Sequence, residues 1–397
     1  MLLHPIDTTQ AEAVTPRAFI VTRMGRIGIA PAGGRVTLEQ GLMGRRADRT
    51  FGDARSGARR AFVSSLHRRG RSLLASILLG AVVAAAPAYA VAAQATDLGI
   101  VSQIPAVYRF TVGDVRVTAL SDGSVPIDLH ALLRGTSQTE VDAMLARSFL
   151  TNPVEVSINA FLLEFDGHKV LVDTGVGDLF GPGNGGRLPE ALALAGVTPD
   201  QITDILLSHI HADHSGGLVR GGKIMFRKAT VHVGKADLDF FLDKANAKRT
   251  GYDVHHFDQG IAMVKPYVDA GKVRAFAVSG EILPGITAEL HPGHTPGTAF
   301  YTLSSRGARL VFIGDTIHAA AVQFPRPDVT LTFDQDQPKA RAVREQAFSA
   351  FASDRILVAA PHLAFPGVGH VARDGTGYGW IPIEYADRAA PAPTEDR

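Results

Sequence analysis

Residues 206–217 read Leu-Leu-Ser-His-Ile-His-Ala-Asp-His-Ser-Gly-Gly, so three histidines and an aspartate fall within six positions directly after an apolar run. Imidazole and carboxylate are the ligands that borderline divalent metals such as zinc prefer. In an extended or turning segment, His209 and His211 point the same way. Asp213 and His214 fall in the turn beyond and can face a neighbouring point, so one loop could serve two metal ions. The alternative is a surface histidine patch that binds metal only adventitiously.

The net charge of the chain, +1, averages two unlike parts. Residues 1–90 contain 13 Arg, no Lys and 5 acidic residues, which gives +8. The remaining 27 basic and 34 acidic residues give residues 91–397 a charge of −7. An acidic body argues against a nucleic-acid partner, because binding to phosphates depends on Lys and Arg. The chain has no cysteine, which excludes disulfides, thiolate metal ligands and a Cys nucleophile.

Residues 1–90 have the pattern of an export leader. Arg59 and Arg60 precede an apolar run over 73–86, and Ala88-Tyr89-Ala90 then forms an A-x-A site suited to cleavage after Ala90. The Arg pair resembles a twin-arginine signal, which predicts an exported, periplasmic or secreted protein without stable membrane association. The alternative is an uncleaved anchor, but the apolar run is short for a span of about 20 residues. Residues 1–42 show no clear periodicity, which fits a misassigned start and a signal peptide over about 43–90.

Residues 91–397 alternate between strand-like and helix-like patterns, which predicts sheets covered by helices in one large domain. Paired strands are expected over 110–127, with turns at Gly113-Asp114 and Asp122-Gly123, and over 157–172 with a hairpin turn at Asp166-Gly167. Helices are expected over 188–195, 236–247 and 338–352, and further strands over 202–207, 272–278, 299–303, 310–313 and 356–360.

Three further candidate ligands follow apolar strands downstream of the histidine-rich run. His294 lies in a loop rich in Gly and Pro, Asp315 follows the run 310–314, and His362 follows the run 356–361. Each one alone is more simply explained as a cap or turn residue. Together with the first cluster, they supply the seven ligands that two metal ions and a bridging carboxylate require.

The H-x-H-x-D-H pattern of His209 to His214, together with Val172-Asp173-Thr174-Gly175, resembles the metallo-β-lactamase superfamily. This resemblance extends from about Tyr108 to Tyr385. It implies an αββα sandwich of two mixed sheets, in which Asp173 supports the metal loop. Within the superfamily the chain is most similar to the methyl parathion hydrolase family. The stretches that carry this likeness lie outside the metal signature, at 117–123, 179–182, 321–324 and 362–370.

The resemblance implies a role for each ligand. One metal ion would be held by His209, His211 and His294, and the other by Asp213, His214 and His362, with Asp315 bridging both. Zinc is the default metal, although Mn, Fe or Co could occupy such N and O ligands. A hydroxide between the ions would attack phosphorus or a carbonyl carbon, and Asp213 could orient it or receive a proton.

The substrate-binding residues implied by the resemblance are aromatic, namely Phe180, Phe241 and Phe257. Core packing is the alternative explanation for each of these rings. The neighbouring His255 and His256 are predicted to be exposed loop residues. The resemblance also suggests a homodimer.

These residues favour a dinuclear hydrolase of small neutral phosphotriesters or aryl esters. The alternative is a lactonase that acts on acyl-homoserine lactones or dihydrocoumarin, because the same hydroxide serves both reactions. A more remote alternative is a di-iron oxidoreductase of the same fold. That class would replace one ligand histidine by glutamate and add a flavin domain, and the sequence has neither feature. A nuclease of this fold would need a basic surface, and a metal-free binding module would have lost ligands.

Overall fold

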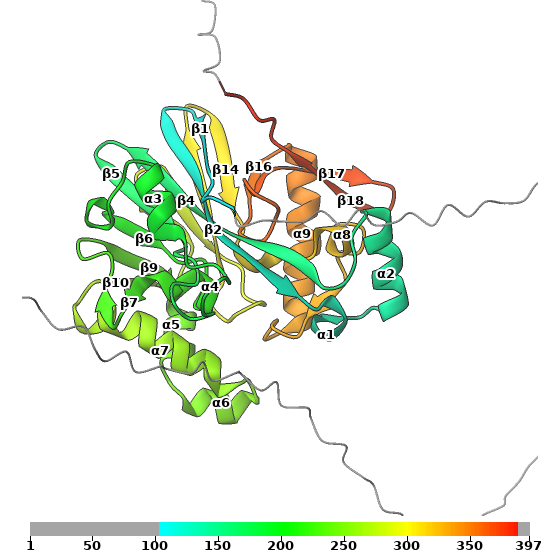
Figure 1. Cartoon of the computed structure of the whole chain (residues 1–397), viewed down its shortest axis with the longest axis horizontal. Coiled ribbons are helices and arrows are strands. Elements are labelled where there is room, and N and C mark those ends of the chain that lie inside the picture. Colours follow the sequence, from blue (N-terminus) through cyan, green and yellow to red (C-terminus); the bar gives the residue numbers. More distant parts are fainter. Residues whose placement is uncertain (1–102, 388–397) are drawn as a thin grey trace, which may run out of the picture. The chain divides into compact units, whose positions relative to one another are not determined.

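The computed structural model describes residues 103–387 (Figure 1). The predicted leader over residues 1–90 lies outside the described residues, together with its cleavage site and the twin-arginine pair. The structure therefore does not test these predictions. No helix within residues 103–387 is both long enough and apolar enough to cross a membrane.

The first of two large sheets is built from the N-terminal half of the described chain. Its strands β1, β2, β4 and β5 pair antiparallel, whereas β5, β6, β9 and β10 pair parallel, so the sheet is mixed. The strand order is β1 (Val107–Val112), β2 (Val115–Ile127), β4 (Val154–Phe165), β5 (His168–Val172), β6 (Asp204–Leu206), β9 (Thr230–Gly234) and β10 (Val273–Phe276).

The second sheet is built from the C-terminal half. Only its central pair β14–β16 is parallel, because a helix connects these two strands. The strand order is β11 (Gly280–Leu283), β12 (Ile286–Leu290), β13 (Ala299–Ser305), β14 (Ala308–Phe312), β16 (Leu357–Ala359), β17 (Val368–Asp374) and β18 (Gly377–Pro382). Two small two-stranded sheets pair β3 (Leu133–Arg134) with β15 (Thr330–Leu331) and β7 (Val219–Arg220) with β8 (Lys223–Ile224).

Helices cover the outer face of each sheet. In Figure 1, α5 and α7 lie beside β9 and β10, while α9 lies beside β16 and β17. The helices that pack on the first sheet are α3 (Leu188–Leu194), α5 (Lys235–Phe241), α6 (Ala245–Thr250) and α7 (Val254–Asp269). Those at the second sheet and at the ends of β2 and β4 are α1 (Leu129–Leu132), α2 (Gln138–Arg147), α8 (Ala320–Gln323) and α9 (Gln337–Asp354).

The inner faces of the two sheets share one hydrophobic core. Phe161 of β4 and Phe312 of β14 meet across it with ring centroids 5.3 Å apart, and each ring is about 2% exposed. Burial of a side chain of this size contributes roughly 1.5–3 kcal/mol. Separate apolar clusters join the first sheet to α3, α5 and α7 and the second sheet to α9. The predicted αββα sandwich of two mixed sheets is therefore confirmed.

Most predicted elements are present, and the differences lie in the helical region before β10 and in one turn of β2. The hairpin turn at Asp166-Gly167 and the helix from residue 188 are confirmed. The helix predicted over 236–247 is in fact two helices, α5 and α6, separated by Leu242 to Lys244. The sequence analysis also missed α7, in which the predicted loop residues His255 and His256 form the first turn. The turn predicted at Asp122-Gly123 is a bulge within β2.

The loop that follows β5 packs directly against the histidine-rich loop. Thr174 donates from both its backbone N and its Oγ1 to the carbonyl of His214, at 2.7 and 2.8 Å. A Cβ added to Gly217 would lie 2.0 Å from the carbonyl oxygen of Thr174. The glycine pair that ends the histidine-rich run is therefore required by the close approach of two backbones.

Gly217→Ala is expected to destabilise the fold by about 2 kcal/mol or more, because backbone atoms cannot move away from the new methyl group without disrupting the metal loop. Gly280→Ala is the matched control, since nothing lies within 4 Å of its added Cβ and neither glycine has a positive φ. Urea unfolding of both variants measures the difference. Equal stability of the two variants would show that the loop adapts to the methyl group.

Candidate metal centre

Loops at the strand ends of both sheets bring the seven predicted ligands together. The histidine-rich loop follows β6 and runs into α4 (Ala212–Ser215). His294 lies between β12 and β13, Asp315 directly follows β14, and His362 follows β16. The seven form two groups that share Asp315, and within each group one ligand atom per residue lies within 4.8 Å of the others.

The first group consists of His209, His211, His294 and Asp315. His211 Nδ1 lies 2.9 Å from His209 Nε2 and 3.1 Å from His294 Nε2. The Oδ2 atom of Asp315 lies 3.1 Å from His294 Nε2 and 3.4 Å from His209 Nε2. Three imidazole nitrogens and one carboxylate oxygen therefore surround a single point.

The second group uses the other oxygen of the same carboxylate. Asp315 Oδ1 lies 3.0 Å from both His214 Nε2 and His362 Nε2. Asp213 Oδ2 completes this group, 3.3 Å from His362 Nε2 and 3.6 Å from His214 Nε2. Asp315 thus presents one oxygen to each group, which is the geometry of a carboxylate that bridges two ions.

The donor atoms fit divalent cations. His214 Nε2, His362 Nε2 and Asp315 Oδ1 are buried and make no hydrogen bond with the described residues. Buried polar atoms are normally paired, so such a cluster points to a bound ion. The set is made of nitrogen and oxygen only, which suits zinc and also Mn, Fe or Co. These residues could therefore hold two divalent ions.

Charges within the cluster shift its pKa values strongly. Burial disfavours the ionised form of Asp315, but the surrounding histidines, His214 first, hold its pKa well below the usual range. Burial also opposes protonation of His294 and His362. Asp315 and a second carboxylate outweigh that effect and raise their pKa values to about 9 and about 10. In the metal-free protein, protonated His294 and His362 supply positive charge at the positions where metal ions would supply it.

Buried carboxylates fix the loops that carry the ligands. Asp173 lies 2.8 Å from His214 Nδ1 and accepts from the backbone N and Oγ of Ser208, so it supports the loop as the resemblance implied. Asp334, which the sequence analysis did not identify, lies 2.9 Å from His294 Nδ1. Carboxylates in these positions orient a metal-binding imidazole and raise its basicity.

Asp237 of α5 joins two of the ligand loops. It accepts from the backbone N of Ile210, between two ligand histidines, and from the backbone N of Gly297, just after His294. Burial raises its pKa to about 6 despite these hydrogen bonds. The sequence offered no signal for this residue other than a carboxylate at the start of a helix.

Tyr252 contacts the metal group from the segment between α6 and α7. Its Oη lies 2.8 Å from His211 Nε2. Because His211 Nδ1 faces the other candidate ligands, Nε2 would carry the proton when a metal is bound and would donate it to the tyrosine oxygen. Tyr252 is therefore positioned to fix both the tautomer and the orientation of His211.

A cavity of about 500 Å³ opens beside the two groups. Its walls come from the end of β2, the loop after β5, the start of α7 and the loop before α9. Apolar residues dominate it. The lining residues that are not metal ligands are Val125, Pro126, Ile127, Leu179, Phe180, Asn184, Ala212, His255, His256, Gln259, His318 and Phe333.

The structure separates the three phenylalanines that were predicted to bind substrate. Phe180 lines the cavity, whereas Phe241 and Phe257 are fully buried beneath it and do not line it. Phe241 packs edge-on against His211, with ring centroids 5.5 Å apart, so it supports a ligand from within the core. His255 is exposed as predicted and His256 is half-buried, and both line the cavity from α7 rather than from a loop.

His318 was given no role from the sequence but lies at the bridging carboxylate. Its Nε2 is 3.0 Å from Asp315 Oδ2, and its ring stacks on His362 at 4.6 Å. The spacing Asp-x-x-His after an apolar strand was the only signal that could have identified it.

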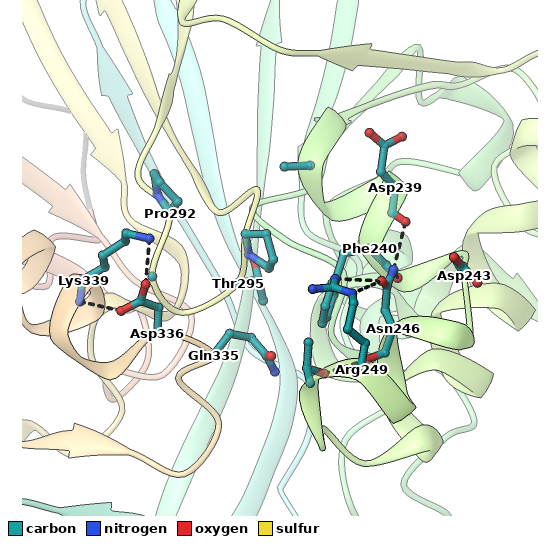
Figure 2. A pocket seen from close by; sticks show the side chains of 14 residues that line it. Asp239, Phe240, Asp243, Asn246, Arg249, Pro292, Thr295, Gln335, Asp336 and Lys339 are labelled. Carbon is teal, nitrogen blue, oxygen red and sulfur yellow. Dashed lines mark hydrogen bonds and ion pairs between the residues drawn. The ribbon is translucent and has the colours of Figure 1, made fainter.

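A second cavity, of about 610 Å³, shares no lining residue with the first (Figure 2). It lies between α5, α6 and residues 292–296. The charged groups in its wall are paired with their neighbours: Arg249 donates to Asn246, and Lys339 pairs with Asp336 at 2.7 Å. These pairs leave no convergent charged site in this cavity.

Comparison with known families and structures agrees with this geometry. The family model of the metallo-beta-lactamase superfamily matches residues 153–362. The crystal structure of AbOPH, a hydrolase in the beta lactamase superfamily, is 33% identical with a TM-score of 0.68. AidC, a dizinc quorum-quenching lactonase in complex with the product N-hexanoyl-L-homoserine, is 26% identical with a TM-score of 0.65. Each alignment covers 72% of this chain and all of the other.

Two curated relatives are anti-Pycsar proteins named Apyc1. The protein from Saccharibacillus brassicae is 27% identical over 194 residues, which is 47% of this chain and 69% of the relative. The protein from Paenibacillus harenae is 43% identical over 60 residues, which is 15% of this chain and 21% of the relative. The match therefore spans only about a fifth of the length of this second relative.

Tyr252→Phe is expected to lower the affinity of the first group for zinc by about 10- to 100-fold, because His211 loses the partner that fixes its tautomer. Competition with a chromogenic chelator measures the affinity. Tyr378→Phe is the control, since that ring packs against Phe348 at the α9 face. Unchanged zinc affinity in Tyr252→Phe would remove the role assigned to the hydroxyl.

Zinc binding at pH 7.5 is expected to release about two protons per chain, because His294 and His362 are protonated at that pH and must lose their protons before they bind a metal. Both folded pKa values are raised, so these groups stabilise the metal-free protein fully below pH 6.5. That contribution is lost as pH rises through about 9 to 10. Titration of zinc into weakly buffered protein measures the released acid. Zinc binding without acid release would contradict these protonation states.

Proposed function

This chain belongs to the metallo-beta-lactamase superfamily, and we propose that it is a dinuclear metal-dependent hydrolase of small neutral phosphotriesters or aryl esters. Zinc is the metal that we propose for both positions. Export through the predicted leader and a homodimeric state belong to the same proposal.

The position of Asp315 carries this proposal. A carboxylate with one oxygen at each of two ligand groups would hold two ions close together, as in two-metal hydrolases where they are about 3.5–4 Å apart. Two bound ions would supply an acidified water at neutral pH and would polarise the oxygen of the bond to be broken.

The cavity favours a neutral substrate. None of its lining residues, all of which lie in the described chain, is Lys or Arg, so an anionic substrate would find neither of these side chains there. Leu179 and Phe180 from the loop after β5 line the cavity together with the apolar end of β2. Walls of this kind suit the apolar groups of an ester.

Asp213 is the ligand best placed to move a proton. It is the only one of the seven that is not fully buried, with a side chain 19% exposed, and it lines the cavity. Its Oδ2 atom lies toward the second group, which leaves Oδ1 to orient the attacking water and to accept its proton. Asp315, whose two oxygens both face histidines, stays ionised and holds the ligand groups together.

A lactone is the second candidate substrate. AidC, whose solved structure contains a ring-opened lactone, is 26% identical over nearly three quarters of this chain. Hydrolysis of a lactone and of an aryl ester needs the same attacking water, so the ligand residues cannot separate them. The shape and polarity of the cavity would decide between the two.

The zinc-loaded protein is expected to hold about two ions per chain and to hydrolyse methyl parathion, paraoxon or an aryl acetate. His209→Ala is expected to lose an ion and to lower kcat/KM by about 1000-fold or more, since one ligand group is broken. Metal analysis and steady-state kinetics on the same samples measure both effects.

A long-chain lactone assayed beside these substrates separates the two candidates. A kcat/KM for the lactone that exceeds the others by orders of magnitude would make the protein a lactonase. Full activity in His209→Ala, or a wild-type protein that binds no zinc, would refute the dinuclear mechanism itself.

A further inference from the structure

The first two turns of α7 carry a polar stripe in a cavity whose other walls are apolar, apart from the candidate ligands, Asn184 and His318. His255, His256 and Gln259 line the cavity, and their spacing places them on one face of the helix. The opposite face is buried in the core through Phe257 and Val264. Apolar residues would fill the cavity face equally well, so these three polar side chains require an explanation.

Close packing brings this stripe to the metal groups. A Cβ on Gly260 would lie 3.1 Å from Cγ2 of Ile210 and 3.2 Å from Cβ of Phe241, so α7 rests almost directly on the histidine-rich loop. The ring of His256 lies 5.3 Å from that of His211 and stacks on Tyr252 at 4.6 Å. His256 therefore marks the metal end of the stripe.

Gln259 lies one turn further along the helix, roughly 4.5 Å of rise beyond His256. Its side-chain amide nitrogen lies 3.0 Å from His255 Nε2, so the amide NH₂ donates to the imidazole. This contact fixes the orientation of the amide and leaves the Oε1 acceptor for another partner. Gln259 as a whole is 9% exposed, but its Oε1 atom is not among the fully buried polar atoms that lack a hydrogen-bond partner, so this oxygen is open to the cavity. An acceptor that is open to the cavity favours a ligand that supplies an N–H group.

We infer that Gln259, oriented by His255, selects neutral esters whose acyl part carries an amide N–H. This inference rests on the proposed hydrolase function. The metal groups act on the ester carbonyl, the apolar walls hold the alkyl parts, and Gln259 accepts the amide N–H. A site that hydrogen-bonds part of a substrate discriminates strongly against an analogue that lacks that group.

Two esters of matched chain length test this selection: 4-nitrophenyl hexanoate and the 4-nitrophenyl ester of N-acetyl-β-alanine, which replaces two chain atoms by an amide. In Gln259→Leu, kcat/KM for the amide ester is expected to fall by about 10-fold or more, mainly through KM, while the hexanoate changes by less than about 2-fold. The ratio of variant to wild type cancels the different intrinsic reactivities of the two esters.

Two further variants complete the experiment. Gln259→Glu retains an acceptor and is expected to keep part of the preference, whereas Gln346→Leu on the exposed face of α9 is expected to change neither ester. Zinc content, measured for every variant, is expected to be unchanged. An equal loss on both esters, or no loss on either, would overturn the role of Gln259. If the zinc-loaded wild type hydrolyses neither ester nor any substrate named above, the proposed function fails as well.

Discussion

The two oxygens of Asp315 connect the two halves of this molecule. This carboxylate is 2% exposed and lies among histidines from the first sheet and from loops of the second. A buried charge of this kind is tolerated only when opposite charge surrounds it. In the metal-free state that charge comes from protonated histidines, and in a loaded state it would come from metal ions. The ends of β6, β12, β14 and β16, which carry the ligand loops, must therefore lie close to one point, and the order of the strands in the two sheets places them there.

Buried groups around the ligands keep this convergence rigid. Asp173, Asp237 and Asp334 each attach a ligand loop to the scaffold through hydrogen bonds of 2.6–2.9 Å. Arg344 of α9 extends this hydrogen-bond network toward the outer face of the sheet. It is 1% exposed and donates to the carbonyl of Thr316, directly after Asp315, and to that of Val329, in the segment before Asp334. A helix on the outer face of the second sheet thus helps to position a ligand on its inner edge. These hydrogen bonds keep the metal-binding atoms in place when protons on the histidines are exchanged for metal ions.

The sequence predicted the parts of this site that depend on local pattern. The ligands were found because each follows an apolar strand and because five of the seven are histidines, which rarely gather by chance. Tyr252, Asp334 and Gln259 were missed because their roles arise from contacts between segments far apart in the chain. The region 235–269 was also misread, since His255 and His256 open α7 with polar residues behind an Asp253 cap and so resemble a loop. Phe241 and Phe257 show the opposite error, because an aromatic residue near a site looks the same in sequence whether it faces the cavity or the core.

The candidate metal ligands and the residue proposed to select the substrate, Gln259, lie on different elements. All seven ligands follow strands, whose ends are fixed by backbone hydrogen bonds across the sheets, and a change there would alter the metal groups themselves. The polar stripe of the cavity lies on α7, which packs on the metal loop at Gly260 and brings the ring of His256 to 5.3 Å from that of His211. Gln259 lies one turn further along the helix and hydrogen-bonds to His255 rather than to a candidate ligand, so a substitution there is expected to change which ester is accepted while the ligands stay in place. The ligand set does not distinguish phosphotriesters, aryl esters and lactones, so the proposed selection is sought in the cavity residues of α7 and of the loop after β5.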